Sequence, residues 1–177
     1  MRPSLAEKIA ELENLARIGK LKAEAGEPSE MEGLAVSGKA RLKDAKNAML
    51  AFESRFDLAY NAAHALSLAA LRGHGYRSEN RYLVFQTLQH TLKLPAAQWR
   101  VLAKAHEKRN LAEYEGHFDV DETLLGELIE VADLILARLP GPGKRVEQKR
   151  ATYRVTAKKK AAKVGTNLQK RRNKLSS

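Results

Sequence analysis

Residues 53–73, ESRFDLAYNAAHALSLAALRG, decide the fold of this chain. Phe56, Ala59, Tyr60 and Ala63 recur at helical spacing, and nearly every position between them is small or aliphatic. A helix that is apolar around most of its circumference is typical of the centre of a bundle, because neighbours on several sides must cover it. The stretch therefore predicts a central helix with other helices packed around it.

Amphipathic patterns flank this central helix on both sides. Their apolar spacing predicts further helices over residues 5–23, 30–50, 79–93, 96–115 and 120–139. Four local signals accompany them: capping pairs Ser4/Glu7, Ser29/Glu32 and Asp119/Glu122 at helix starts, and Gly116 at a helix end. Gly38 predicts a bend in the second helix. We predict an all-α fold, an up-and-down bundle over residues 29–139, with an extra N-terminal helix within residues 1–28.

The composition argues against several classes of protein. A chain of 177 residues has room for one domain with appendages. The absence of cysteine excludes disulfides and cysteine metal sites. No apolar run approaches the roughly 20 residues that span a bilayer, and the N-terminus lacks the apolar region of a secretory signal. We expect a cytoplasmic protein without a metal or a cofactor.

The positive charge gathers at the C-terminal end. Of the 32 Lys and Arg in the chain, whose net charge is +11, 13 fall within residues 144–177, where Glu147 is the sole acid. The other 19 lie earlier in the chain against 20 Asp and Glu, and the run Pro140-Gly-Pro-Gly143 separates the two parts. We therefore predict a linker and a mobile basic tail over residues 140–177.

Such a tail attracts phosphate backbones without sequence preference, so nucleic acid, RNA before DNA, is the expected partner. A solubilising tail with no dedicated partner is the alternative, and no membrane is expected. The predicted contacts are the basic side chains of the tail: Lys144, Arg145, Lys149, Arg150, Arg154, Lys158, Lys159, Lys160, Lys163, Lys170, Arg171, Arg172 and Lys174.

Polar side chains interrupt two of the apolar helices. The central helix carries three on one face, Asp57, Asn61 and His64, at spacings of four and three. The helix over 96–115 carries a matching set: His106, Arg109, Asn110 and Glu113, with Tyr114 just beyond. Because buried polar groups need partners, we predict that the two sets form one pocket.

Two interpretations of this pocket remain open. Arg109 has a planar guanidinium that can grip a phosphate with two hydrogen bonds, which favours a phosphate or nucleotide site. The alternative is structural: Arg109 and Glu113 form a pair four residues apart on a solvated face, while Asn61 and His64 satisfy a core or dimer contact.

Residues 55–77 (RFDLAYNAAHALSLAALRGHGYR), 82–92 (YLVFQTLQHTL) and 108–116 (KRNLAEYEG), followed by an amphipathic helix, resemble the HEPN family over about residues 30–139. That family consists of small helical bundles and includes metal-independent ribonucleases. Its nucleases carry an arginine, often followed directly by asparagine, with a histidine after four to six further residues. Arg109 and Asn110 match this motif, and Tyr114 stands where the histidine would be.

The resemblance implies a homodimer whose paired active site lies at the two-fold interface, with Arg109 on the scissile phosphate. Arg109, Asn110 and Tyr114 are then the candidate catalytic residues. A tyrosine with a pKa of about 10 is ionised only about once in 10³ at pH 7, so Tyr114 makes a poor general base. His64 or His106 would have to replace it.

Three functions follow from these observations. The leading hypothesis is a catalytically degenerate HEPN-like bundle that binds RNA non-specifically through its tail. The second is a metal-independent endoribonuclease of a toxin–antitoxin or defence system. The third is a non-catalytic module that pairs with a protein partner of nucleotidyltransferase or antitoxin type.

Overall fold

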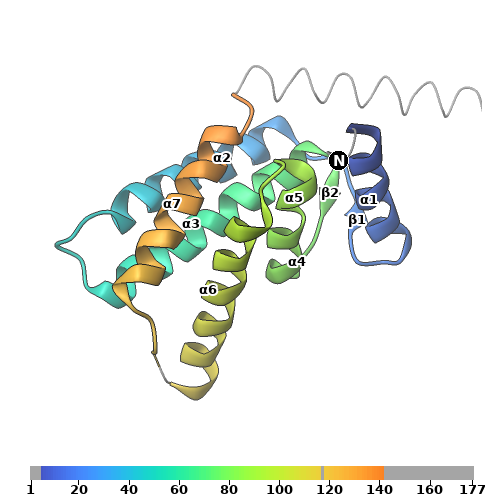
Figure 1. Ribbon diagram of the computed structural model, residues 1–177. Helices are drawn as coiled ribbons and strands as arrows, with labels where there is room; N and C mark the ends of the chain where they lie inside the picture. Colours follow the sequence, from blue (N-terminus) through green and yellow to red (C-terminus); the bar gives the residue numbers. More distant parts are fainter. Residues whose placement is uncertain (1–4, 117, 142–177) are drawn as a thin grey trace, which may run out of the picture. The chain divides into compact units, whose positions relative to one another are not determined.

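The computed structural model describes residues 5–116 and 118–141 of the chain (Figure 1). The chain divides into two units, Met1–Leu139 and Pro140–Ser177. The helices that the structure describes, and the candidate site, belong to the first unit. The basic side chains predicted to contact nucleic acid, from Lys144 to Lys174, lie outside the described residues.

The first unit is an all-α helical bundle with one very small antiparallel sheet (Figure 1). Its helices are α1 Leu5–Arg17, α2 Pro28–Ala45, α3 Phe52–Gly73, α4 Arg81–Gln86, α5 Leu88–Thr91, α6 Ala96–Glu115 and α7 Glu122–Arg138. The strands are β1 Lys22–Ala23 and β2 Tyr76–Arg77. No helix in the described part of the chain is both long and apolar enough to cross a membrane.

Helix α3 lies at the centre of the bundle, as its apolar sequence predicts. It packs against α2, α4, α5, α6 and α7 (Figure 1). Its Phe56, Tyr60 and Leu66 are fully buried. Burying a large apolar side chain of this kind contributes about 1.5–3 kcal/mol. The central helix therefore organises the main core, to which α6 adds Leu102 and α7 adds Leu128.

Helix α2 continues through Gly38 as one helix, and the bend expected there stays a prediction. Gly38 is buried against α3, where a Cβ atom in its place would lie 2.7 Å from Cγ of Leu66. That distance is shorter than carbon atoms tolerate. The glycine lets two helix backbones approach closely, which explains its position within a helix.

Several predicted helix boundaries also differ from the structure. The first helix ends at Arg17 instead of residue 23, because the chain turns at Gly19 with φ +75° and enters β1. The segment over 79–93 forms two short helices, separated at Thr87, whose hydroxyl donates to the carbonyl of Val84 (2.7 Å). Gly116 ends α6 in the left-handed conformation, as predicted.

Two of the predicted caps are displaced along the chain. Helix α2 begins at Pro28, whose missing N–H suits the first turn, and not after a Ser29 cap. Helix α7 is capped by Asp121, whose Oδ1 accepts a hydrogen bond from the Leu124 amide (2.8 Å), and not by Asp119. Both shifts are two residues or fewer, within the usual range for local signals.

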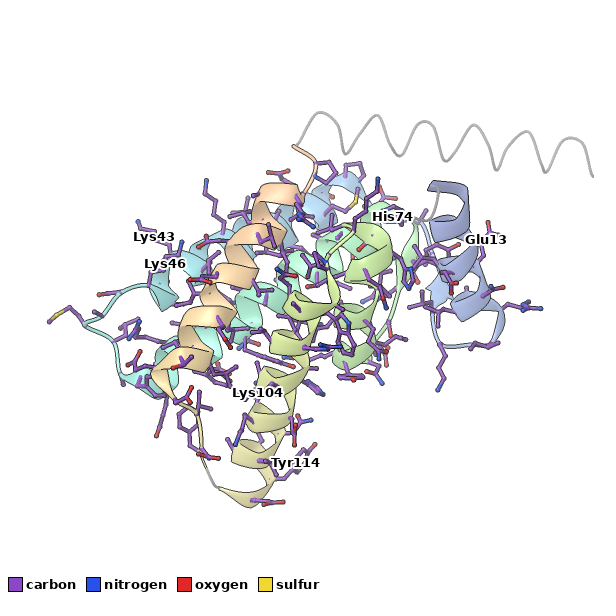
Figure 2. The ribbon with its side chains drawn as sticks, viewed as in Figure 1. Glu13, Lys43, Lys46, His74, Lys104 and Tyr114 are labelled. Atoms are coloured by element: carbon purple, nitrogen blue, oxygen red, sulfur yellow. The ribbon has the colours of Figure 1, made fainter. Side chains whose placement is uncertain are left out.

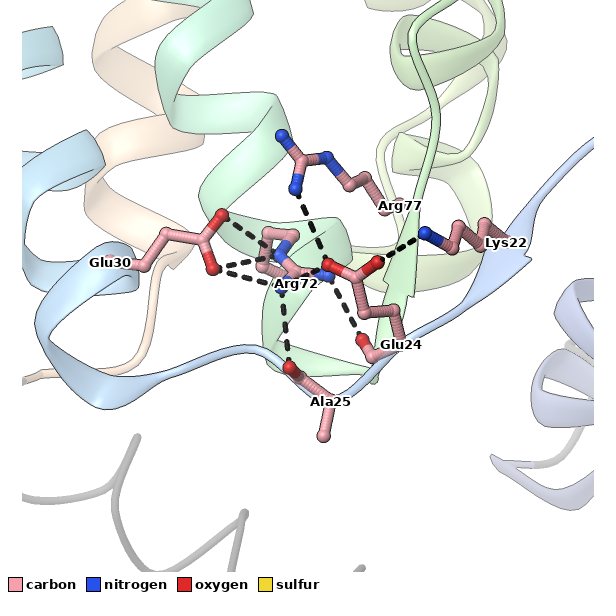
Figure 3. A network of polar contacts seen from close by, with 6 residues as sticks. All are labelled: Lys22, Glu24, Ala25, Glu30, Arg72 and Arg77. Carbon is pink, nitrogen blue, oxygen red and sulfur yellow. Dashed lines mark hydrogen bonds and ion pairs between the residues drawn. The ribbon is translucent and has the colours of Figure 1, made fainter.

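Buried Arg72 ties the segment between α1 and α2 to the end of α3 (Figure 3). Its guanidinium donates to the Glu30 carboxylate at 2.8–3.1 Å and to the carbonyl oxygen atoms of Glu24 (2.9 Å) and Ala25 (3.3 Å). The hydrogen bonds from Arg72 lower the pKa of Glu30 below its ordinary value. The arginine is thus a fully partnered buried charge that holds the β1 side of the molecule in place.

Candidate functional site

A fully buried tyrosine joins α3 to α4 and α6. The hydroxyl oxygen of Tyr60 lies 2.7 Å from Nδ1 of His106, and its ring packs edge-on against Phe85 with centroids 5.7 Å apart. The other ring nitrogen of His106, Nε2, lies 3.1 Å from the amide nitrogen of Asn110. Because that amide nitrogen donates, Nε2 accepts, and Nδ1 carries the proton that it donates to Tyr60. The hydroxyl proton of Tyr60 is not used in this bond.

Two arginines lie over the ring of this tyrosine. The Cζ atom of Arg109 is 4.9 Å from the centroid of the Tyr60 ring, and the Cζ atom of Arg81 is 5.8 Å from it. Both distances fall within the range of a cation–π interaction. Helix packing therefore places guanidinium groups from α4 and α6, which are 28 residues apart in sequence, within reach of the same aromatic ring.

The two arginines differ in how their charge is compensated. Arg109 pairs with two carboxylates, through Nε to Asp57 (3.3 Å) and through a terminal nitrogen to Glu113 (2.7 Å). Arg81 donates to the neutral side-chain oxygen of Asn61 (3.2 Å) and forms no ion pair among the residues that the structure describes. Asn61 in turn donates to the Asp57 carboxylate (2.9 Å). Arg81 therefore has no direct carboxylate partner among the described residues.

The local environment keeps the neighbouring histidines neutral. Burial lowers the pKa of His64 to about 4, and the nearby charges of Arg81 and Arg109 act in the same direction. Burial also lowers the pKa of His106, again with the help of both arginines. Burial raises the pKa of Tyr60. Near neutral pH the cationic charge of the cluster thus resides on the two arginines.

This arrangement is suited to binding an anion. Asp57 and Glu113 have side chains that are 56% and 50% exposed, so their ion pairs with Arg109 are solvated and contribute little free energy. A phosphate can replace either carboxylate and receive two parallel hydrogen bonds from the guanidinium. Half-buried Tyr82 and Trp99, with ring centroids 6.4 Å apart, add aromatic surface beside His106.

Most of the side chains predicted to form a pocket do come together. The structure gathers six of them into one network of contacts around Tyr60: Asp57, Asn61, His106, Arg109, Asn110 and Glu113. His64 lies at its edge, with its ring 6.0 Å from that of Phe85. The Arg109–Glu113 pair of the structural alternative is present as well.

Tyr114 does not join this network. It lies near the C-terminal end of α6 (Figure 2). Its surface is 85% exposed. It is four residues beyond Asn110, but its side chain is not among those that contact Tyr60 or His106 in the described structure. The position at which the resemblance predicts a histidine is therefore separate from the arginine cluster.

The sequence pattern did not reveal Tyr60 and Arg81. The apolar neighbours of Tyr60 indicate a core residue, although it directly precedes Asn61 and lies one helical turn after Asp57. Arg81 opens a short helix and has no polar partner nearby in sequence. Only its contact with Asn61, 20 residues away, identifies it as part of the site.

No protein-family model matches the chain, and no curated protein matches it. Within residues 5–116 and 118–141, no group of three or more His, Asp or Glu is arranged to hold a metal ion.

Proposed function

We propose that this protein is a HEPN-like helical bundle that binds nucleic acid, RNA in preference to DNA, and is catalytically degenerate. One observation carries the proposal: Arg81 and Arg109 lie over the same tyrosine ring, and Arg81 has no carboxylate partner in the described structure. Paired guanidinium groups recognise phosphate by charge and by geometry. The segregation of 13 Lys and Arg into residues 144–177 supports the same class of ligand.

In this proposal the two arginines hold one phosphate of the strand. The tail supplies attraction to the backbone that is independent of sequence, and the aromatic surface of Tyr82 and Trp99 offers stacking to a base. The exposed position of Tyr114, away from the arginines, supports the degenerate character of the site. Two copies of the chain would form the homodimer that the HEPN resemblance implies.

A salt titration tests the proposal. Fluorescence anisotropy of a labelled single-stranded RNA is measured with the full chain between about 50 and 200 mM KCl, a range over which phosphate contacts weaken strongly. Arg81→Gln/Arg109→Gln is compared with Lys39→Gln/Lys43→Gln, which removes two exposed charges from α2. A third variant replaces Lys158, Lys159 and Lys160 by Gln.

We expect the arginine variant and the tail variant each to weaken binding. Each should also lower the slope of log K against log salt by about 0.7 for every phosphate that the variant no longer binds. The α2 variant should resemble the wild type. Wild-type binding that does not depend on salt, or equal binding by the arginine and α2 variants, would contradict the proposal.

A second candidate function is metal-independent RNA cleavage, and the position of His64 favours it. This imidazole is neutral near pH 7, lies close enough to both arginines for their charges to lower its pKa, and forms no hydrogen bond among the described residues. A neutral ring nitrogen beside a bound phosphate can accept a proton from a ribose hydroxyl, and a pKa of about 4 makes His64 a weak base for this step.

Cleavage of labelled RNA in EDTA buffer decides between the two functions. If the protein is a nuclease, the wild type forms cleavage products. These products should disappear with Arg109→Ala and decrease strongly with His64→Gln. Products that persist in both variants indicate a contaminating nuclease, and the absence of wild-type products rules out this second function.

A further inference from the structure

A second group of positive side chains surrounds an open pocket beside the small sheet. The pocket has a volume of about 580 Å³ and lies between the turn after α1 and the loop that leads from β2 into α4. Lys20, Lys22 and Arg77 line it together with a single carboxylate, that of Glu79. Three cations against one anion make its electrostatic potential favourable for a negatively charged ligand.

The sheet places two of these cations side by side. Lys22 and Arg77 are directly opposite each other in the antiparallel pair, so both side chains project from the same face. Like charges in this position repel each other and destabilise a sheet. Glu24 offsets part of the cost, because its carboxylate lies 2.8 Å from the Lys22 ammonium and 3.3 Å from the Arg77 guanidinium (Figure 3).

Glu24 cannot neutralise the whole group. Its carboxylate also pairs with Arg72 at 3.3 Å, so three cations share it (Figure 3). Lys20 adds a further exposed charge and forms no ion pair within the described part of the chain. The pocket therefore keeps surplus positive charge after its internal pairs are counted.

Neutral donors in the same pocket remain available to a ligand. The hydroxyl oxygen of Ser78 accepts a hydrogen bond from the Asn80 amide (3.2 Å), which leaves the hydroxyl proton unused. The side-chain oxygen of Asn80 accepts from the Leu83 amide (3.0 Å), which leaves its NH₂ group for another acceptor. Phosphate oxygen atoms accept from both kinds of donor.

The pocket adjoins the arginine cluster along the chain. Asn80 lines the pocket, and the next residue, Arg81, lies over the ring of Tyr60. Because these two residues are consecutive, the second positive pocket begins one residue away from Arg81 along the chain. The Glu79 carboxylate repels any anion in the pocket, which disfavours a small free anion. A strand that is already held at Arg81 tolerates this one repulsive contact.

We propose that the pocket formed by Lys20, Lys22, Arg77, Ser78 and Asn80 is a second phosphodiester subsite, which binds the same nucleic-acid strand that Arg81 and Arg109 hold. The inference rests on the proposed nucleic-acid binding and extends it from one phosphate to a path over the surface of the bundle. The proposed occupant is a phosphodiester group of a nucleic-acid strand. A free mononucleotide would present the same kind of phosphate and is the alternative occupant.

The test uses Lys20→Gln/Lys22→Gln in the full chain, because this variant leaves Arg72 and Arg77 in place. Lys39→Gln/Lys43→Gln on α2 is the matched control, since it removes the same number of exposed lysines. Anisotropy with labelled single-stranded RNA gives affinity and salt dependence, and thermal unfolding by circular dichroism confirms that both variants are folded. Adenosine 5′-monophosphate serves as the competitor that represents a free nucleotide.

We expect the pocket variant to bind RNA several-fold more weakly than the control, with a salt slope lower by about 0.7 for every phosphate that is released from the pocket. Adenosine monophosphate should not displace the strand from the wild type. If the pocket variant binds like the control while Arg81→Gln/Arg109→Gln weakens binding, the second subsite is refuted and the proposed function stands. If the wild type binds no RNA, the proposed function fails as well. Efficient displacement by adenosine monophosphate would show a nucleotide pocket instead of a strand subsite.

Discussion

Replacing Arg72 by methionine provides the sharpest test of how this fold is held together. Arg72→Met keeps a long side chain at the end of α3 but removes every hydrogen bond that the guanidinium donates to Glu30, Glu24 and Ala25. Two backbone carbonyls in the segment before α2 then lose their donor. We expect the segment over residues 22–30 to lose its anchor on α3.

The magnitude follows from the burial of the partners. Removing one member of a fully buried ion pair costs about 3–5 kcal/mol of the free energy of unfolding. Here the carboxylates of Glu24 and Glu30 are 31% and 34% exposed, so water can solvate them once the arginine is gone. The carbonyls still lose their hydrogen bonds, at about 1 kcal/mol each. We therefore expect a destabilisation of about 3 kcal/mol.

Urea unfolding followed by far-ultraviolet circular dichroism measures this destabilisation. The matched control is Arg77→Met, because Arg77 contacts the same Glu24 carboxylate from a position that is 50% exposed. Exposed pairs contribute about 0–1 kcal/mol, so the control should be nearly neutral. The urea concentration at the unfolding midpoint should be lower for Arg72→Met than for the wild type, with little change in the slope of the unfolding transition.

Acid provides a second measurement on the same network. Bonding to Arg72 holds the pKa of Glu30 below its ordinary value of 4.5, so the carboxylate stabilises the fold above that pH and loses this contribution as the pH falls through its folded-state pKa. Arg72→Met should remove this part of the pH dependence. Three results would refute the anchoring role of Arg72. These are a destabilisation by Arg72→Met below about 1 kcal/mol, a destabilisation equal to that of Arg77→Met, or an unchanged dependence of stability on acid pH.

Three further predictions concern the core and the site. Gly38→Ala should lower the free energy of unfolding by about 1–2 kcal/mol, because its Cβ would overlap α3. Gly33→Ala has open space around it and should raise the free energy of unfolding by about 0.5–1 kcal/mol. Urea titrations that show the same sign for both variants would contradict the close packing at Gly38. The ring protons of His64 should titrate in NMR spectra with a pKa of about 4. Because the unfolded chain takes up this proton near pH 6.5, the fold should lose stability as the pH falls from 6.5 towards 4. A titration midpoint near 6.5 would exclude the buried environment beside the two arginines. Tyr60→Phe should cost about 1 kcal/mol because it removes the hydrogen bond to His106, and urea midpoints equal to those of the wild type would argue against that bond.

Much of the fold could be predicted from sequence because helix formation is local. Apolar residues three and four positions apart share one face of a helix, so the order and approximate length of α2, α3, α6 and α7 follow from spacing alone. Errors occurred at the ends of helices, where the turn at Gly19, the Thr87 hydroxyl and the Asp121 cap set the boundaries. The close fit of Gly38 against Leu66 depends instead on a contact with a distant part of the chain, which the spacing of residues does not show.

The candidate site could be predicted only in part, for the same reason. Spacing placed Asp57 with Asn61 on one helix and Arg109 with Glu113 on another, since each pair lies within one turn. It also grouped Tyr114 with Arg109, although the two residues are five positions apart. The structure leaves Tyr114 exposed, because a rotation of five residues along a helix turns the side chain away from the face that Arg109 occupies.

The sequence by itself determined an all-α chain, a central apolar helix and a separate basic segment, because composition, periodicity and charge need no knowledge of which residues meet. Only the tertiary structure decided that Tyr60 bonds to His106, 46 residues away, and that Arg81 joins Arg109 over its ring. These contacts depend on the angle and depth at which α3, α4 and α6 pack. That geometry is set by the interdigitation of buried side chains from several helices, which no local pattern of residues contains.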